Sequence, residues 1–146
     1  MIRLSALLTV ILFTFWTFAA CAACDWRLID PGNGRFTTGT LSLDLGEADT
    51  NQPPTAWQGP VTIARQDGGS CTVDPAVGII ERPIFANVTI LLISTFSGSN
   101  RTIFGVDGRS CKVLWKSRPF TGDVTLHGAR LILGRTTLML QKSCLP

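Results

Sequence analysis

Histidine is almost absent from this chain, whose 146 residues include a single one, His127. A structural zinc site needs four nitrogen or sulfur ligands, and the cysteines do not form the close C-x-x-C pairs typical of such sites. A serine hydrolase needs a positioned nucleophile, base and orienting acid, and no nucleophile elbow lies near His127. We therefore expect no metal, no cofactor and no catalytic residue, and interpret His127, beside Gly128, as a surface residue at a hairpin corner.

Dense runs of lysine and arginine are also lacking, as is helical spacing of apolar residues. The formal charge of +3 falls to +2 without the first 23 residues, whose only charged side chain is Arg3. The basic residues are scattered and show little aromatic interleaving, which argues against nucleic acid as a partner. Alternation and turn residues dominate instead, so the sequence predicts an all-β protein.

The N-terminal segment has the pattern of a secretory signal peptide. Arg3 precedes an apolar run over residues 7–18, which is too short to span a bilayer permanently, and small residues follow at 19–23. Cleavage is expected just before Ala23 or Cys24, which leaves one domain over residues 24–146 and no membrane span. The alternative reads Phe18-Ala19-Ala20-Cys21 as a lipobox with Cys21 as a lipid anchor, although Phe suits the first position poorly. Both alternatives predict export to the periplasm.

Export places the four remaining cysteines in an oxidising compartment, where two disulfides are expected. Cys24, Cys71, Cys111 and Cys144 have 46, 39 and 32 residues between them. Three connectivities are possible. We favour Cys24–Cys71 with Cys111–Cys144, because each half of the chain then closes its own loop.

Apolar segments separated by turn residues predict the strands of one β domain. Residues 90–93 are apolar without alternation, so they should form a central strand buried on both faces. Residues 47–60 have no apolar period and are interpreted as an exposed loop. Hairpin corners are expected at Asp107-Gly108, His127-Gly128 and Gly134. The expected strands cover residues 26–29, 36–45, 61–65, 77–80, 88–96, 101–106, 112–116, 124–126, 130–133 and 137–141.

One predicted hairpin, residues 102–116, resembles the strand, Asp turn and Gly-Lys-Val-Leu-Trp-like strand of quinoprotein-type propeller blades. The chain is too short for a full propeller of four-stranded blades. The expected fold is therefore antiparallel sheets in a compact propeller-like or sandwich arrangement. A plain hairpin with Trp115 in the core explains the pattern equally well. Asp30, Asp107 and Asp123 lie next to Gly or Pro or at turns and are interpreted as turn formers whose carboxylates accept backbone hydrogen bonds.

The segment Phe96-Ser97-Gly98-Ser99-Asn100 is the strongest candidate for function. It follows the most hydrophobic strand and precedes another, so it should form a short projecting loop on a rigid base. Gly98 permits positive φ, and the serine hydroxyls offer donor and acceptor at a tip of little bulk. Such a loop fits a narrow cleft, although an ordinary solvated turn has the same composition.

The order of motifs resembles the periplasmic immunity proteins that neutralise type VI secreted peptidoglycan amidases of the first amidase family. The resemblance rests on Phe96-Ser97-Gly98-Ser99, on Cys111-Lys112-Val113 and on the spacing of Cys24, Cys71 and Cys111. It implies a compact β protein whose partner is a cognate Cys-His amidase, with Ser99 hydrogen-bonded to the catalytic histidine. Around such a plug we expect Phe96, Asn100 and Arg101 at the rim of a rigid contact surface. Asn100 stands where a second serine occurs in the family.

Three other functions remain open from the residues. A periplasmic lysozyme inhibitor would use a similar loop against another wall-degrading enzyme. A secreted hydrolase would need catalytic groups clustered around His127. A glycan-binding module would need Trp26, Trp57 or Trp115 exposed on one face.

Overall fold

The structure, a computed structural model, describes residues 24–146; the proposed signal peptide and lipobox lie outside the described residues. The expectation of an all-β domain with antiparallel sheets is confirmed. The strands are β1 (Arg27–Ile29), β2 (Arg35–Thr38), β3 (Leu41–Asp44), β4 (Glu47–Ala48), β5 (Ala56–Gln58), β6 (Thr62–Arg65), β7 (Ser70–Thr72), β8 (Ile79–Ala86), β9 (Ile90–Ser97), β10 (Asn100–Asp107), β11 (Val113–Lys116), β12 (Val124–His127), β13 (Arg130–Leu133) and β14 (Thr136–Met139).

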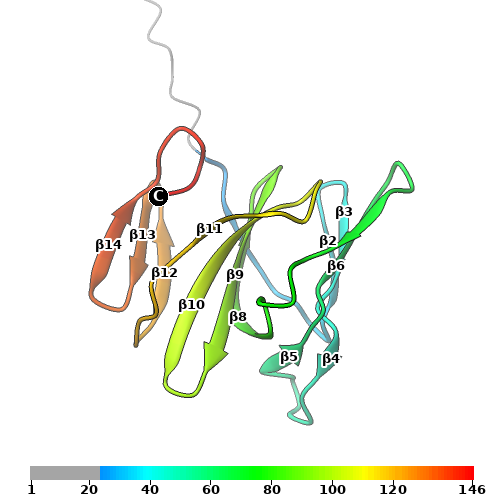
Figure 1. Ribbon diagram of the computed structural model, residues 1–146, viewed down its shortest axis with the longest axis horizontal. Coiled ribbons are helices and arrows are strands. Elements are labelled where there is room, and N and C mark those ends of the chain that lie inside the picture. Colours follow the sequence, from blue (N-terminus) through cyan, green and yellow to red (C-terminus); the bar gives the residue numbers. More distant parts are fainter. Residues whose placement is uncertain (1–23) are drawn as a thin grey trace, which may run out of the picture.

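The strands form three sheets that lie one after another along the molecule (Figure 1). The first sheet has the order β2-β3-β6-β7, and the last sheet has the order β12-β13-β14. Between them lies the central sheet, with the order β11-β10-β9-β8-β5-β4 and with β1 paired to β8. The sheets stack face to face, as the layers of a sandwich do.

The central sheet is buried on both faces, which explains the unbroken apolar run of β9. Leu91 and Ile93 point toward the first sheet and pack with Leu41, Leu43 and Ile63. Ile90 and Leu92 point the other way and pack with residues of the last sheet. Successive strand residues face opposite sides, so a strand covered on both sides must be apolar at every position. The prediction for residues 90–93 is confirmed.

Four hairpins turn on glycine followed by one other residue: Gly39-Thr40, Gly98-Ser99, Gly128-Ala129 and Gly134-Arg135. Each glycine has a φ between 56° and 64°, and none of the second residues has a positive φ. This is the pattern of a type II′ turn, which suits the right-handed twist of paired strands. The corners expected at Gly128 and Gly134 are therefore confirmed.

Two expectations about the first half were wrong. Residues 36–45 form β2 and β3 instead of one strand, because Gly39 and Thr40 reverse the chain inside an otherwise strand-like threonine and leucine pattern. Residues 47–60 include the paired strands β4 and β5, and the side chain of Trp57 is only 1% exposed. The exposed part is the connection over residues 49–55, where the Asp49 carboxylate accepts bonds from Asn51 and Thr55.

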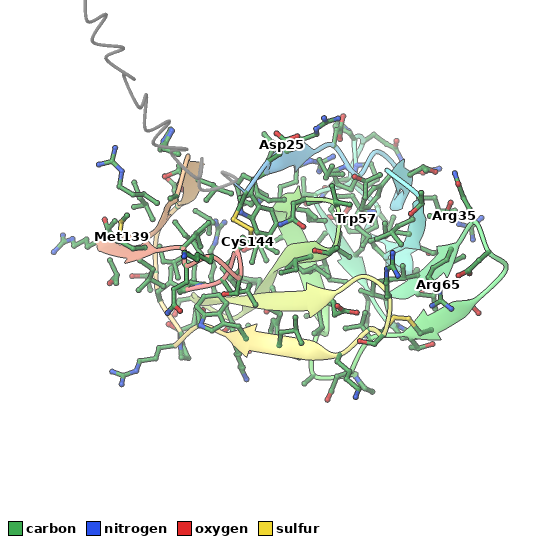
Figure 2. The ribbon with its side chains drawn as sticks, turned by 90° about the horizontal axis from the view of Figure 1, so that it is seen from above. Asp25, Arg35, Trp57, Arg65, Met139 and Cys144 are labelled. Carbon is green, nitrogen blue, oxygen red and sulfur yellow. A yellow bond between two sulfur atoms is a disulfide. The ribbon has the colours of Figure 1, made fainter. Side chains whose placement is uncertain are left out.

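Both expected disulfides are present, but the favoured pairing was wrong: the bonds are Cys24–Cys144 and Cys71–Cys111. The chain enters through β1 of the central sheet, on the side covered by the last sheet, so Cys24 meets the C-terminal segment (Figure 2). Cys71 on β7 meets Cys111 in the β10–β11 connection. Each bond therefore joins the central sheet to a different neighbour.

The disulfides indicate an oxidising compartment outside the cytoplasm. Within residues 24–146 no helix is long and apolar enough to cross a membrane.

Candidate functional site: the β9–β10 hairpin tip

The longest hairpin of the described chain carries the candidate loop at its tip. β9 and β10 pair over eight positions, from Ser97 opposite Asn100 to Ile90 opposite Asp107. Only Gly98 and Ser99 lie between the strands, and both are exposed. Gly98 has a φ of 64°, and a Cβ added to it would have no atom within 4 Å. The tip is thus a narrow projection whose conformation depends on glycine and whose surroundings are open.

The base of the hairpin is fixed by contacts on both sides. On β9, the Ser94 hydroxyl donates to the Pro83 carbonyl oxygen over 2.6 Å, and Ser94 is fully buried. On β10, the Arg101 N–H donates to the Phe120 carbonyl over 2.8 Å, and the Phe120 N–H donates back over 3.0 Å. With the apolar residues of β9 and β10 in both cores, these bonds make the tip an extension of the most buried part of the protein.

An ion pair lies beneath the tip. Arg101 Nε is 2.8 Å from Glu81 Oε1, and the Glu81 side chain is 16% exposed. Burial raises the pKa of Glu81, and the positive charge of Arg101 partly opposes this effect. Phe96 lies opposite Arg101 across the strand pair and is 40% exposed. Arg101 is therefore held by the sheet, and Phe96 is the large apolar side chain available beside the tip.

Chemically, the hairpin offers contacts without a reactive group. The Ser99 hydroxyl is a donor and an acceptor, and the neighbouring Ser97 and Asn100 side chains are also polar and exposed. Five hollows on the surface of residues 24–146 have no residue of 96–101 in their linings. A convex tip of this kind has the shape to enter the cavity of another molecule and does not itself enclose a ligand.

The remaining candidate residues lie elsewhere. His127 is exposed at the end of β12, opposite Arg130. Asp30 accepts a backbone bond from Gly32, as expected of a turn former, and this bond and Arg82 lower its pKa. Asp107 accepts bonds from Arg109 and Ser110; burial acts to raise its pKa, but these bonds lower it overall. Asp123 accepts a hydrogen bond from the Gly134 N–H through its backbone carbonyl oxygen, not through its carboxylate.

The three tryptophans of the described chain do not form an exposed platform. Trp57 is in the core between the first and central sheets, with Arg82 stacked 5.0 Å from its ring centroid. Trp26 and Trp115 are half-buried against the core of the last sheet. The aromatic face that a glycan-binding module would need is therefore not built from these residues.

Two features near the tip were not predicted from the sequence. The Glu81–Arg101 pair joins residues 20 positions apart, and only the register of β8, β9 and β10 brings them together. A groove of about 490 Å³ between residues 115–120 and the last sheet was also missed. Its only signal in the sequence is the mixture of aromatic and basic residues from Trp115 to Phe120.

No protein-family model matches the chain, and no curated protein matches it significantly. The described residues contain no group of three or more His, Cys, Asp and Glu side chains placed to hold a metal ion.

Proposed function

We propose that this chain is an immunity protein, exported by its signal peptide to the periplasm, that occludes the active site of a type VI secreted peptidoglycan amidase. Its bound partner is a Cys-His enzyme, and its own contribution is binding without catalysis. The producing cell is protected because the enzyme cannot reach the cell wall.

The observation that carries the proposal is the shape of the β9–β10 tip. Gly98 and Ser99 project from a hairpin that is buried farther down, over residues 90–95 and 103–106, and a Cβ added to Gly98 would meet no atom within 4 Å. A rigid projection loses little conformational freedom on binding, and this preserves affinity. The resemblance of Phe96-Ser97-Gly98-Ser99 to the immunity family supports the same position.

Inhibition follows from the chemistry of the Cys-His pair. The histidine must accept the thiol proton to generate the thiolate nucleophile. A Ser99 hydroxyl hydrogen-bonded to that imidazole occupies the nitrogen needed as base, while Phe96 and Asn100 fill space that the peptide substrate requires. Neither contact needs a catalytic group on this chain.

The test uses the purified disulfide-bonded chain and the product of the neighbouring open reading frame, which the proposal predicts to be a Cys-His amidase. The dissociation constant and peptidoglycan hydrolysis are the readouts. Ser99→Trp should clash with the cleft and abolish inhibition, whereas Ser99→Ala loses roughly one hydrogen bond, about 0.5–1.5 kcal/mol, or up to about 3 if the partner is charged. Gly98→Val should also weaken binding, because a β-branched residue at a φ of 64° is strained.

The chain offers matched controls in the Gly128-Ala129 turn. Gly128 has a φ of 59° and, like Gly98, has no atom within 4 Å of an added Cβ, and Ala129 is exposed as Ser99 is. This turn lies at the opposite end of the strands from the β9–β10 tip: in Figure 1 the tip is at the lower end, whereas β12 runs upward to the turn. Gly128→Val and Ala129→Trp should therefore cause similar local strain and leave inhibition intact. Unchanged inhibition by folded Ser99→Trp and Gly98→Val variants would refute the proposal, as would tight binding to lysozyme with none to the amidase.

A further inference from the structure

Charge is divided unevenly along the described chain. Residues 24–107 contain nine acidic and five basic side chains, and each of the five arginines forms an ion pair. Residues 108–146 contain one acidic side chain, Asp123, and seven basic ones. Within the part of the chain that the structure describes, none of those seven has an ion pair or a side-chain hydrogen bond. They are Arg109, Lys112, Lys116, Arg118, Arg130, Arg135 and Lys142.

Three of these cations, Lys116, Arg118 and Arg135, lie at the end of the molecule that carries the hairpin tip. Lys116 on β11 lies opposite Phe104 of β10, and Phe120 forms a bridge with Arg101, closer to the tip. Arg118 lies between Lys116 and Phe120 in the sequence. Arg135 follows Gly134, whose Cα lies beside Thr121, next to Phe120. We call these three the tip-side cations. Lys112 precedes β11, Arg130 begins β13 and Lys142 follows β14. All three therefore lie toward the ends of these strands that are away from the hairpin tip.

The tip-side cations flank the groove between residues 115–120 and the last sheet. Lys116 and Arg118 are in its lining, together with Trp115, Pro119, Phe120 and Leu138, and the lining has no Asp or Glu side chain. Lys116 Nζ is 5.1 Å from the Phe104 ring centroid, and its charge is otherwise directed to solvent. Next to the convex tip, the protein thus presents a basic and partly aromatic hollow whose lining contains no acidic side chain; Asp123, whose backbone carbonyl accepts from the Gly134 N–H, is the acidic residue closest in sequence.

We infer that the tip-side cations are a second contact surface, which fits an acidic patch beside the active-site cleft of the amidase. This inference rests on the proposed function and adds a partner chemistry to it. Unpaired exposed charges attract an opposite surface over about one Debye length and orient the encounter before close contact forms. The cations accordingly act mainly on the association rate, and the tip acts on the dissociation rate.

The experiment compares two triple variants of the full disulfide-bonded chain with equal changes in net charge. The variant Lys116→Glu/Arg118→Glu/Arg135→Glu reverses the charge of the three tip-side cations. The control variant Lys112→Glu/Arg130→Glu/Lys142→Glu reverses three positive charges away from the tip. Association and dissociation rates with the amidase are measured at about 10 mM and about 150 mM ionic strength, where the Debye length is about 30 Å and about 8 Å. Circular dichroism checks the fold of each variant.

The tip-side variant should associate at least about tenfold more slowly than wild type at low ionic strength, with a smaller difference at about 150 mM and little change in dissociation. The control variant should show a clearly smaller effect. Equal slowing by both variants would overturn the inference, because it would show a response to net charge alone. An unchanged rate for a folded tip-side variant would also overturn it while leaving the occluding tip in place. Absence of any binding by the wild-type chain would instead refute the proposed function, and the inference with it.

Discussion

Removal of the Cys71–Cys111 disulfide should lower the free energy of unfolding by about 4 kcal/mol. The bond closes a loop with a sequence separation of 40 residues, and the closure entropy of a loop of this length corresponds to about 4 kcal/mol at 25 °C. Cys111 has a φ of 59°, so alanine at this position carries the same backbone strain as cysteine. The difference between wild type and Cys71→Ala/Cys111→Ala therefore reports mainly the bond.

The magnitude is large for a domain of this size, since typical stabilities are about 5–15 kcal/mol. Urea unfolding followed by circular dichroism measures it directly. With a slope of about 1–3 kcal/mol per molar urea, the midpoint should fall by more than about 1 M. The matched variant Cys24→Ala/Cys144→Ala opens a longer loop, with a separation of 120, and should lose at least as much.

The structure also predicts where each variant loosens first. Cys71–Cys111 joins the first sheet to the central sheet, so its loss should speed amide hydrogen exchange in β2, β3, β6 and β7. Loss of Cys24–Cys144 should speed exchange in β12, β13 and β14 instead. Faster exchange in the same strands for both variants, or a stability loss below about 1 kcal/mol, would refute the view that each bond secures a different pair of sheets.

Two further predictions concern single side chains. Burial raises the pKa of Glu81, so the folded state keeps the proton of this carboxyl to a higher pH than the unfolded chain does. The contribution of Glu81 to the free energy of unfolding therefore falls as the pH rises above its ordinary pKa of 4.5. The stability of Glu81→Gln relative to wild type should therefore increase with pH just above that value in paired urea titrations, and a flat difference would contradict the burial effect. His127→Ala should leave the amidase dissociation constant unchanged, because His127 is exposed in the turn region opposite the tip; an activity of the purified chain on peptidoglycan that this substitution abolishes would establish an enzyme.

The local patterns of the sequence were enough to predict the central strand and the position of the hairpin tip, although the connection is the two residues Gly98 and Ser99 rather than a loop over residues 96–100. A run such as Ile90 to Ile93, in a chain rich in strand patterns, favours a strand buried on both faces, and Gly98 between two serines indicates a tight turn. Long-range pairings were not predictable, because nothing local to Cys24 or Cys71 indicates which sheet lies beside it. The Glu81–Arg101 contact and the tip-side cations depend on register and stacking in the same way. The turn at Gly39 that separates β2 from β3 was not predicted, because the threonines and leucines on both sides of it are typical of strands.

The separation of the hairpin tip from both cores has an evolutionary consequence. A substitution at Ser97, Ser99 or Asn100 alters the exposed surface without disturbing a packed residue, so natural selection at these positions acts on what the tip touches and hardly on folding. Gly98 is the exception, since its φ of 64° restricts the choice of residue. Related chains should therefore keep the glycine and diversify around it, changing the target they recognise while the same three sheets support each new version.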